Sequence, residues 1–383
     1  MPDVASLDPI TVVGAGPSGL ACAIVLAHAG RKVVVREWHA DVGHRFHDDF
    51  QGLENWSHAE DVLDEMRSAG IATDFECHPF DHGTVFDPAG RRYPVRGQRP
   101  LFYLVRRGQE AGTLDRALLD QARAAGAEVR FNDRVRRLDA PGVLSTGPRK
   151  AGIIAVGHLF ETDMPDGAWL ALGHRLAPGG YAYLLVQGGR GTVATCLFTG
   201  FRDQAKYLAA TEEFFTRNAG LQMRNPRPFG GFGNMRLADT AVQGGHPVIG
   251  EQAGFQDALA GFGMRYAIRS GVLAARAIID GNDYATLWQR ELAPWLQAGI
   301  VNRFVFNLAG EAGMTLAIRR LAKRDAGQLL ERAYRLSLPK RLLLPLARRW
   351  YRALLADPSC NHVDCECIWC THGDHEAAVA VAP

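Results

Sequence analysis

The sequence carries little excess charge of either sign and no long apolar run, and each absence excludes a class of protein. Lysine and arginine number 43 against 41 aspartates and glutamates, a formal net charge of +2. So small an excess gives no overall electrostatic attraction to nucleic acid, and we expect no such partner. No run approaches about 18 apolar residues, so we also expect no helix that spans a bilayer.

Cysteine is scarce over most of the chain. There are seven cysteines, four of them crowded between Cys360 and Cys370. The first residues lack the basic and apolar regions of a secretory signal. An odd number of cysteines without such a signal favours a reducing cytosol over a disulfide framework. The sequence therefore predicts a cytoplasmic protein.

A β-α-β unit is predicted at the start of the chain. The apolar run Ile10–Val13 predicts a buried strand, Leu20–Ala29 a helix, and Lys32–Val35 a second strand. A unit of about thirty residues with this order is typical of dinucleotide-binding folds.

The loop between the first strand and the helix has the spacing G-x-G-x-x-G. Gly14 permits the tight turn, Gly16 lets the backbone approach a pyrophosphate, and Gly19 lets helix and strand pack closely. With Pro17 and Ser18 these residues form the predicted phosphate site, because free amides at a helix N-terminus attract anions. Glu37 follows the second strand, where a carboxylate can accept a hydrogen bond from a ribose hydroxyl.

A second glycine-rich segment, V-I-G-E-Q-A-G-F-Q-D-A-L-A-G-F-G over 248–263, precedes a predicted helix at Tyr266–Asp280. It resembles the G-D-A-A-G-x-x-x-P-x-x-G-x-G motif of FAD-dependent geranylgeranyl reductases, within the wider group that includes p-hydroxybenzoate hydroxylase. Glu251 replaces the usual Asp, and Ala258 the usual Pro. The positions that match are Gly250, Ala253, Gly254, Gly261 and Gly263.

This resemblance implies FAD as the cofactor. It implies that Glu251 holds the ribityl chain and that the helix after Gly261, Phe262 and Gly263 faces the flavin. Further similarities extend over roughly residues 8–310: Arg107 matches an arginine that contacts the cofactor, and Gly43-His-Arg45 the loop after the second strand.

The resemblance also implies an α/β fold, with a Rossmann-type FAD-binding domain, an inserted β-sheet substrate domain and a helical C-terminal region. Over residues 180–200, two β runs around glycines predict a hairpin in the substrate domain. Ile153–Val156 is predicted as a further buried strand of the FAD-binding domain. The expected divisions are 1–75, 96–165 and 245–282 for FAD, 76–95 and 166–244 for substrate, 283–356 for the helical region and 357–383 for the tail.

Few side chains stand out as catalytic, because in such flavoproteins the cofactor carries the redox chemistry. The cluster His-Arg-Phe-His-Asp-Asp at 44–49 offers His47 and Asp48 as proton donors near neutral pH. The alternative is a solvated loop. No second G-x-G-x-x-G indicates a separate nicotinamide domain, so NAD(P)H is expected to visit the flavin transiently.

A basic stretch lies near the C-terminus. Residues 319–353 contain eleven lysines and arginines against Asp325 and Glu331, a local balance of +9. Within it, 340–355 mixes apolar and basic residues, which is typical either of a helix on anionic lipid or of an ordinary surface helix. Pro345 argues against one continuous helix. Peripheral contact with the inner face of the membrane is therefore one expectation.

The tail concentrates metal-ligating residues. Cys360, Cys365, Cys367 and Cys370 lie among three histidines, and thiolates and imidazoles are the ligands that zinc prefers. Iron–sulfur ligation is the alternative, and an unstructured tail with reduced thiols is a third interpretation.

We therefore expect an FAD-dependent oxidoreductase that reduces carbon–carbon double bonds of an isoprenoid or other hydrophobic or lipid substrate. One alternative is a flavin-dependent monooxygenase. A second is an electron-transfer flavoprotein with a metal-bearing tail that passes electrons to a redox partner.

Overall fold

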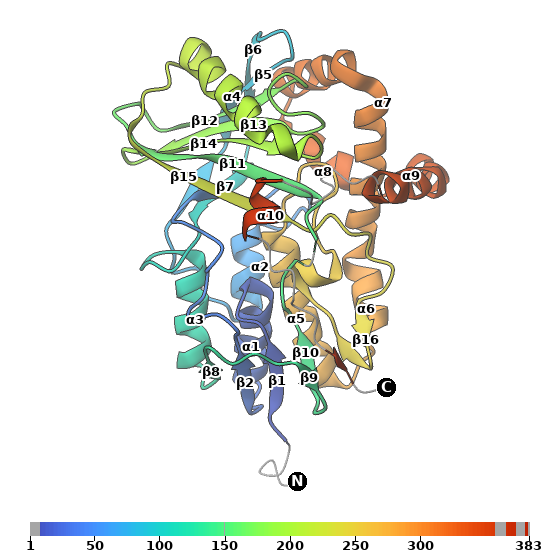
Figure 1. Ribbon diagram of the computed structural model, residues 1–383. Helices are drawn as coiled ribbons and strands as arrows, with labels where there is room; N and C mark the ends of the chain where they lie inside the picture. The colour runs from blue at the N-terminus through green and yellow to red at the C-terminus, as the bar shows by residue number, and fades with distance from the viewer. Residues whose placement is uncertain (1–7, 149, 357–364, 373–379, 382–383) are drawn as a thin grey trace.

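The N-terminal half of the chain builds a parallel sheet, as the first glycine-rich loop predicts. The structure is a computed structural model that describes residues 8–148, 150–356, 365–372 and 380–381 (Figure 1). All neighbouring strands of this sheet run parallel. Its strand order is β10 (Gly142–Leu144), β1 (Ile10–Val13), β2 (Val33–Arg36) and β8 (Glu128–Arg130).

Small residues let helix α1 (Pro17–His28) pack closely on its neighbours. Pro17 occupies the first turn, where its missing N–H costs no helical hydrogen bond. α1 packs against α3 (Leu114–Ala124) and α5 (Met264–Asp280). A Cβ at Gly271 of α5 would lie 2.1 Å from the Ser18 carbonyl oxygen. This close approach brings the N-termini of α1 and α5 to the same edge of the parallel sheet.

Two further sheets lie above this unit. The larger has the order β15 (Arg224–Gly233), β11 (Ile153–Glu161), β14 (Arg190–Leu197), β13 (Tyr181–Gln187), β12 (Gly167–Leu172), β5 (His82–Phe86) and β6 (Arg92–Arg96). The smaller joins β3 (Phe50–Glu54), β7 (Phe102–Arg106) and β4 (Cys77–Phe80). Short ladders pair β16 (Val242–Gln243) with β17 (His246–Pro247), and β18 (Ala380–Val381) with β9 (Arg137–Leu138).

The predicted hairpin is confirmed as β13 and β14, joined at Gly188 and Gly189, which both have positive φ (58° and 76°). Side chains of a strand alternate between the two faces of its sheet. On β13, Ala182 and Leu184 pack towards helix α4 (Gln204–Ala219), which covers the outer face, in a cluster with Phe215. Both faces of β13 are covered, so the strand carries few polar residues.

A helical region follows, drawn from light orange to dark red-orange in Figure 1. It contains α6 (Tyr284–Glu291), α7 (Ala293–Lys323), α8 (Ala326–Tyr334) and α9 (Leu338–Ala356). The backbone at Gly310 is not helical (φ 54°, ψ −159°), and it kinks α7. Among the described residues, no helix is long and apolar enough to cross a membrane. The remaining helices are α2 (Val62–Ser68), α10 (Ile368–His372) and the 3-10 turns Phe201–Asp203 and Gly250–Ala253.

Two expectations about secondary structure were wrong. The strand that starts at Ile153 does not join the FAD-binding sheet. As β11 it pairs with β14 and β15 in the seven-stranded sheet, and the parallel neighbour of β1 is instead β10. Pro345 also lies inside a continuous α9.

Candidate FAD and substrate cavity

One cavity connects the three parts of the molecule. Its volume is about 1250 Å³, and its wall includes the loop after β1, the inner face of the seven-stranded sheet and residues of α7, α8 and α9. Most predicted cofactor residues line it: Gly14, Gly16, Pro17, Ser18, Glu37, Arg45, Arg107, Glu251, Gly261, Phe262 and Gly263. Gly19 and Gly250 do not appear in the wall, and they serve close packing instead.

The glycines of the first loop differ in what surrounds them. A Cβ at Gly14 would lie 2.2 Å from the Ser145 carbonyl oxygen, and one at Gly19 would lie 2.0 Å from the Gly14 carbonyl oxygen. A Cβ at Gly16 would meet nothing within 4 Å. Gly14 and Gly19 are thus required by the fold itself, whereas Gly16 leaves open space in the cavity beside the N-terminus of α1.

Both helix N-termini at this cavity are available to an anion. α1 begins at the N-cap Gly16 and α5 at the N-cap Gly263, and neither cap is satisfied by a side chain. Uncapped amides at a helix start carry a partial positive charge. The open space at Gly16 and these amides fit the pyrophosphate of a dinucleotide.

Glu37 lies at the wall beyond this loop. Its carboxylate accepts hydrogen bonds from the backbone amides of Ala15 (2.7 Å) and His39 (2.9 Å). These bonds fix the carboxylate at the carboxyl end of β2. Trp38, which also lines the cavity, carries the guanidinium of Arg134 4.0 Å over its ring.

Arg45 and Glu251 form an ion pair in the middle of the cavity wall. Arg45 Nη2 lies 2.9 Å from Glu251 Oε2, and the other Glu251 oxygen accepts from the amide of Asn234 (2.8 Å). The longer carboxylate at the position of the usual Asp is therefore held by protein groups on both oxygens. Sequence reasoning named both residues but not their contact, because they lie 206 residues apart.

Arg107 is buried beside the cavity and bound to Asp115 through two hydrogen bonds of 2.8 Å. Asp115 also accepts from the amide of Gly108 at 3.0 Å. The guanidinium stacks 4.0 Å over the ring of Phe46. A bidentate, stacked arginine is rigidly held, so Arg107 presents a fixed edge to the cavity.

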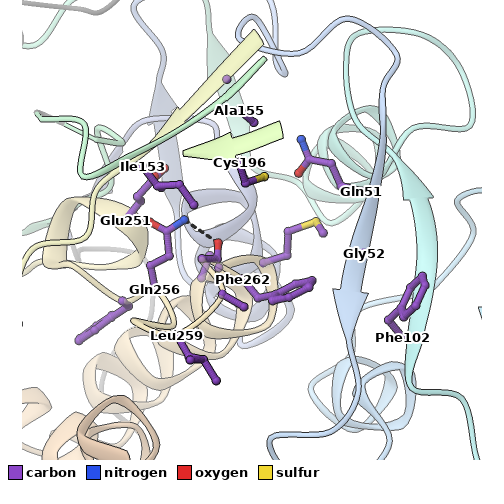
Figure 2. Close-up of a pocket in the computed structure, with 18 of the residues that line it drawn as sticks. Gln51, Gly52, Phe102, Ile153, Ala155, Cys196, Glu251, Gln256, Leu259 and Phe262 are labelled. Atoms are coloured by element: carbon purple, nitrogen blue, oxygen red, sulfur yellow. Dashed lines mark hydrogen bonds between the residues drawn. The ribbon is translucent and has the colours of Figure 1, made fainter. Parts of the chain in front are cut away.

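The loop before α5 closes one side of this central region. Figure 2 shows Gly52 and Phe102 on one side and Ile153 and Gln256 on the other. Gln256 donates to the carbonyl of Gly261 (2.7 Å), and Asp257 accepts from the amide of Ala260 (2.7 Å). Burial raises the pKa of Asp257 to about 6. These bonds hold the loop without the proline that Ala258 replaces.

The expected proton donors His47 and Asp48 do not line the cavity. Asp48 instead pairs with Arg106 (3.0 Å) and Arg190 (3.6 Å), and the amide of His47 is bound by Asp49. The polar cluster at 44–49 therefore stabilises the loop, and only its first three residues face the cavity.

Sequence reasoning missed several residues of the wall. Tyr183 and Cys196 come from the inner face of the sheet, and burial raises both pKa values, that of Cys196 to about 12. Arg303 of α7 is buried and donates to the carbonyl of Leu259 (3.2 Å), and its burial lowers its pKa to about 10. A single arginine in the apolar run 300–306 was a signal that this residue points inwards.

The far end of the cavity is apolar. Strands β12 and β13 and the helical region supply this part of the wall. The apolar lining residues are Leu170, Leu172, Tyr181, Val301, Val305, Phe306, Met314, Ile318, Leu321, Leu329, Leu330 and Leu343.

Comparisons with known proteins agree with this geometry. A model of the NAD(P)-binding Rossmann-like domain matches residues 12–58. The chain is 25% identical to digeranylgeranylglycerophospholipid reductase of Haloferax volcanii over 397 residues, 85% of this chain and 89% of that protein.

Solved structures show the same fold. A geranylgeranyl bacteriochlorophyll reductase-like protein of Thermoplasma acidophilum superimposes with a TM-score of 0.68 at 17% identity, covering 90% of this chain and 98% of the other. A flavin-dependent brominase superimposes with a TM-score of 0.60 at 15% identity, covering 90% and 98%. The resemblance and the α/β fold predicted from the sequence are thus confirmed, and the chain is an FAD-dependent oxidoreductase that resembles the geranylgeranyl reductases.

Proposed function

We propose that this protein reduces carbon–carbon double bonds of an isoprenoid or another long apolar substrate. The observation that carries the proposal is the continuity of one cavity from the open space at Gly16 to the apolar wall of α7 and α8. Its volume of about 1250 Å³ exceeds the roughly 300–1,000 Å³ of an ordinary small-molecule site. It therefore has room for a dinucleotide and for a second, elongated molecule.

In this proposal FAD lies along the predicted residues. Its pyrophosphate lies at Gly14, Gly16, Pro17 and Ser18, and its ribose at Glu37. Arg45, Arg107 and Glu251 position the ribityl region. Gly261, Phe262 and Gly263 would hold the flavin ring.

When bound and reduced, FAD would supply a hydride to one alkene carbon, and the other carbon would receive a proton. The protein has to exclude water and keep a proton available. Tyr183 lies in the cavity wall, and its hydroxyl is protonated at neutral pH, as that of an ordinary tyrosine is; burial raises its pKa further. We assign the proton to Tyr183, which takes a proton back from solvent after each turnover. NAD(P)H is the proposed reductant and leaves as NAD(P)⁺ after each turnover.

The test is an anaerobic reoxidation experiment. The photoreduced enzyme is mixed with a polyprenyl lipid, and the flavin absorbance and the lipid mass are followed. Reoxidation with a gain of two mass units per reduced bond is expected. Reoxidation by oxygen alone, with a hydroxylated product, would replace the proposal with a monooxygenase. No organic substrate together with a copurified redox partner would replace it with an electron carrier.

We further propose that α9 binds an anionic lipid surface, from which such a substrate would enter. Leu338, Leu342 and Leu346 repeat every four residues and are 74%, 84% and 55% exposed. Residues at this spacing share one helix face. Exposed Arg341 and Arg349 lie beside them, and each basic residue near an anionic surface contributes about 1 kcal/mol.

The opposite side of α9 faces the cavity. Lys340 and Leu343 belong to the wall, so one helix separates the apolar end of the cavity from the exposed leucines. Leu308 of α7, against which α9 packs, is 71% exposed and extends the apolar surface. Cosedimentation with phosphatidylglycerol vesicles at low salt, lost at high salt and with phosphatidylcholine, is expected. Equal sedimentation under all conditions would leave α9 as an ordinary surface helix.

A further inference from the structure

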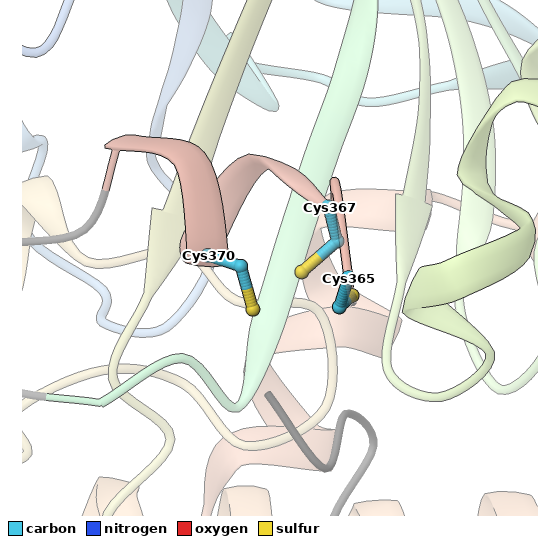
Figure 3. A group of neighbouring side chains, drawn as sticks. All are labelled: Cys365, Cys367 and Cys370. Atoms are coloured by element: carbon cyan, nitrogen blue, oxygen red, sulfur yellow. The ribbon is translucent and has the colours of Figure 1, made fainter. Parts of the chain in front are cut away.

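Three cysteine side chains meet at the start of α10. The sulfur atoms of Cys365, Cys367 and Cys370 all lie within 4.8 Å of one another. Figure 3 shows the three side chains together, on the short turn that leads into α10 and on the helix itself. Cys367 is 1% exposed, and the other two are half-buried.

We propose that these three thiolates bind one zinc ion. Zinc–sulfur bonds of about 2.3 Å at tetrahedral angles separate the sulfurs by about 3.8 Å. The observed spacing of at most 4.8 Å needs only a small adjustment. Each thiol releases one proton to solvent as the ion binds, and the fourth position is left for water or another donor. Cys360, the predicted fourth ligand, lies outside the described residues.

The geometry favours a single bound ion over an iron–sulfur cluster or a disulfide. In a 4Fe–4S cluster each thiolate binds a different iron, so the sulfurs have to stand farther apart than around one shared ion, and a 2Fe–2S cluster brings at most two thiolates to one iron. A disulfide joins two sulfurs and leaves the third of this group without a role. Three sulfurs within 4.8 Å of one another are explained by a single thiophilic ion.

Backbone hydrogen bonds hold the segment that carries the cysteines in place. The amide of Ile368 donates to Gln204 Oε1 (3.1 Å), and Gln204 Nε2 donates to the carbonyl of Glu366 (3.1 Å). Thr371 Oγ1 donates to the carbonyl of Cys367 (2.7 Å). The backbone between the ligands is therefore bound to the start of α4, as outer residues of a metal site are expected to be.

The site also lies next to the cavity. The ring of Trp369 packs edge-on against Phe232 of β15 (4.9 Å between ring centroids), and the guanidinium of Arg45 lies 5.2 Å from the centroid of the same Phe232 ring. A Cβ at position 230 would lie 2.3 Å from Ile368 Cδ1. The absence of a side chain at Gly230 therefore lets α10 pack closely against β15. His372 is itself part of the cavity wall. A bound ion would thus fix a segment of that wall.

Elemental analysis of the untagged full-length holoenzyme is the test. About one zinc per chain is expected in the wild type, and a loss of most of it in Cys365→Ser and in Cys370→Ser. Cys77→Ser, a half-buried cysteine of β4, is the matched control and should keep its zinc. Circular dichroism and FAD content show whether each variant is folded.

Wild-type protein alone gives the second measurement. Replacing the ion with Co²⁺ should produce the strong visible bands of tetrahedral cobalt with thiolate ligands. Removing it with a chelator should lower hydrogen-exchange protection over 365–372 and leave that of α1 unchanged. The proposal is overturned by protein without metal, by iron with its own visible absorbance, or by a disulfide among the three cysteines.

Discussion

Gly16→Val separates FAD binding from folding more cleanly than any other change in the first loop. The backbone of Gly16 is extended (φ −77°, ψ 175°), which any residue adopts, and its Cβ would meet nothing within 4 Å. The isopropyl group would occupy the space where the pyrophosphate approaches. A poorer N-cap costs about 1 kcal/mol, so the apoprotein should remain folded.

The effect of the substitution is therefore expected in the response to FAD. A ligand at a hundred times its dissociation constant stabilises the folded state by about 2.7 kcal/mol. The wild type should show this stabilisation in chemical unfolding with and without added FAD. The Val variant should be colourless, folded by circular dichroism, and equally stable in both titrations.

Gly14→Ala supplies the contrast. Its Cβ would lie 2.2 Å from the Ser145 carbonyl oxygen, and the backbone has φ +107°, so this variant should fail to fold. A yellow Gly16→Val protein with wild-type FAD affinity would refute the assignment of the pyrophosphate to this loop. A Gly16→Val protein that unfolds as Gly14→Ala does would instead refute the expectation that this position tolerates a side chain.

Three further outcomes are expected. Burial raises the pKa of Asp257 from 3.8 to about 6. The folded state then holds a proton that the unfolded state has released, and stability falls as pH rises from about 4 to 6, by up to about 3 kcal/mol. In urea titrations at several pH values, Asp257→Asn should lack this dependence of stability on pH. An unchanged dependence would mean that another group causes it. Tyr183→Phe should lower kcat by roughly 10²-fold with FAD content unchanged, whereas Tyr207→Phe on α4 should not; equal rates would exclude Tyr183 as the proton donor. Leu342→Asp with Leu346→Asp should reduce sedimentation with anionic vesicles, whereas Ile279→Asp on α5 should have no effect.

The elements predicted correctly depend on short stretches of sequence. The strand, glycine loop and helix from Ile10 to His28, and the hairpin around Gly188, each need only neighbouring residues to form. The local sequence patterns were therefore sufficient to predict these elements. The strand at Ile153 was placed in the wrong sheet because an apolar run does not indicate which distant strand it pairs with.

For the candidate site too, the sequence predicted the parts that depend on neighbouring residues and missed those that depend on contacts between distant segments. Glycines marked its cofactor end because a close backbone approach excludes side chains. The Arg45–Glu251 pair and the position of Tyr183 depend on contacts between segments far apart, which a single sequence does not encode locally. His47 and Asp48, the candidates from the sequence, do not line the cavity, and composition does not give the direction of a side chain in a loop.

The alternation along β13 has a consequence for the evolution of selectivity. Its odd-numbered residues, Tyr181, Tyr183 and Leu185, face the cavity, while Ala182 and Leu184 anchor the strand under α4. Because Tyr183 is the assigned proton donor, mutations at Tyr181 and Leu185 are the ones that should change which substrates the enzyme accepts. Mutations at Ala182 and Leu184 should instead lower stability with little change in preference. A random library confined to the codons of Tyr181 and Leu185 would therefore explore new substrates while keeping both the proton donor and the packing under α4.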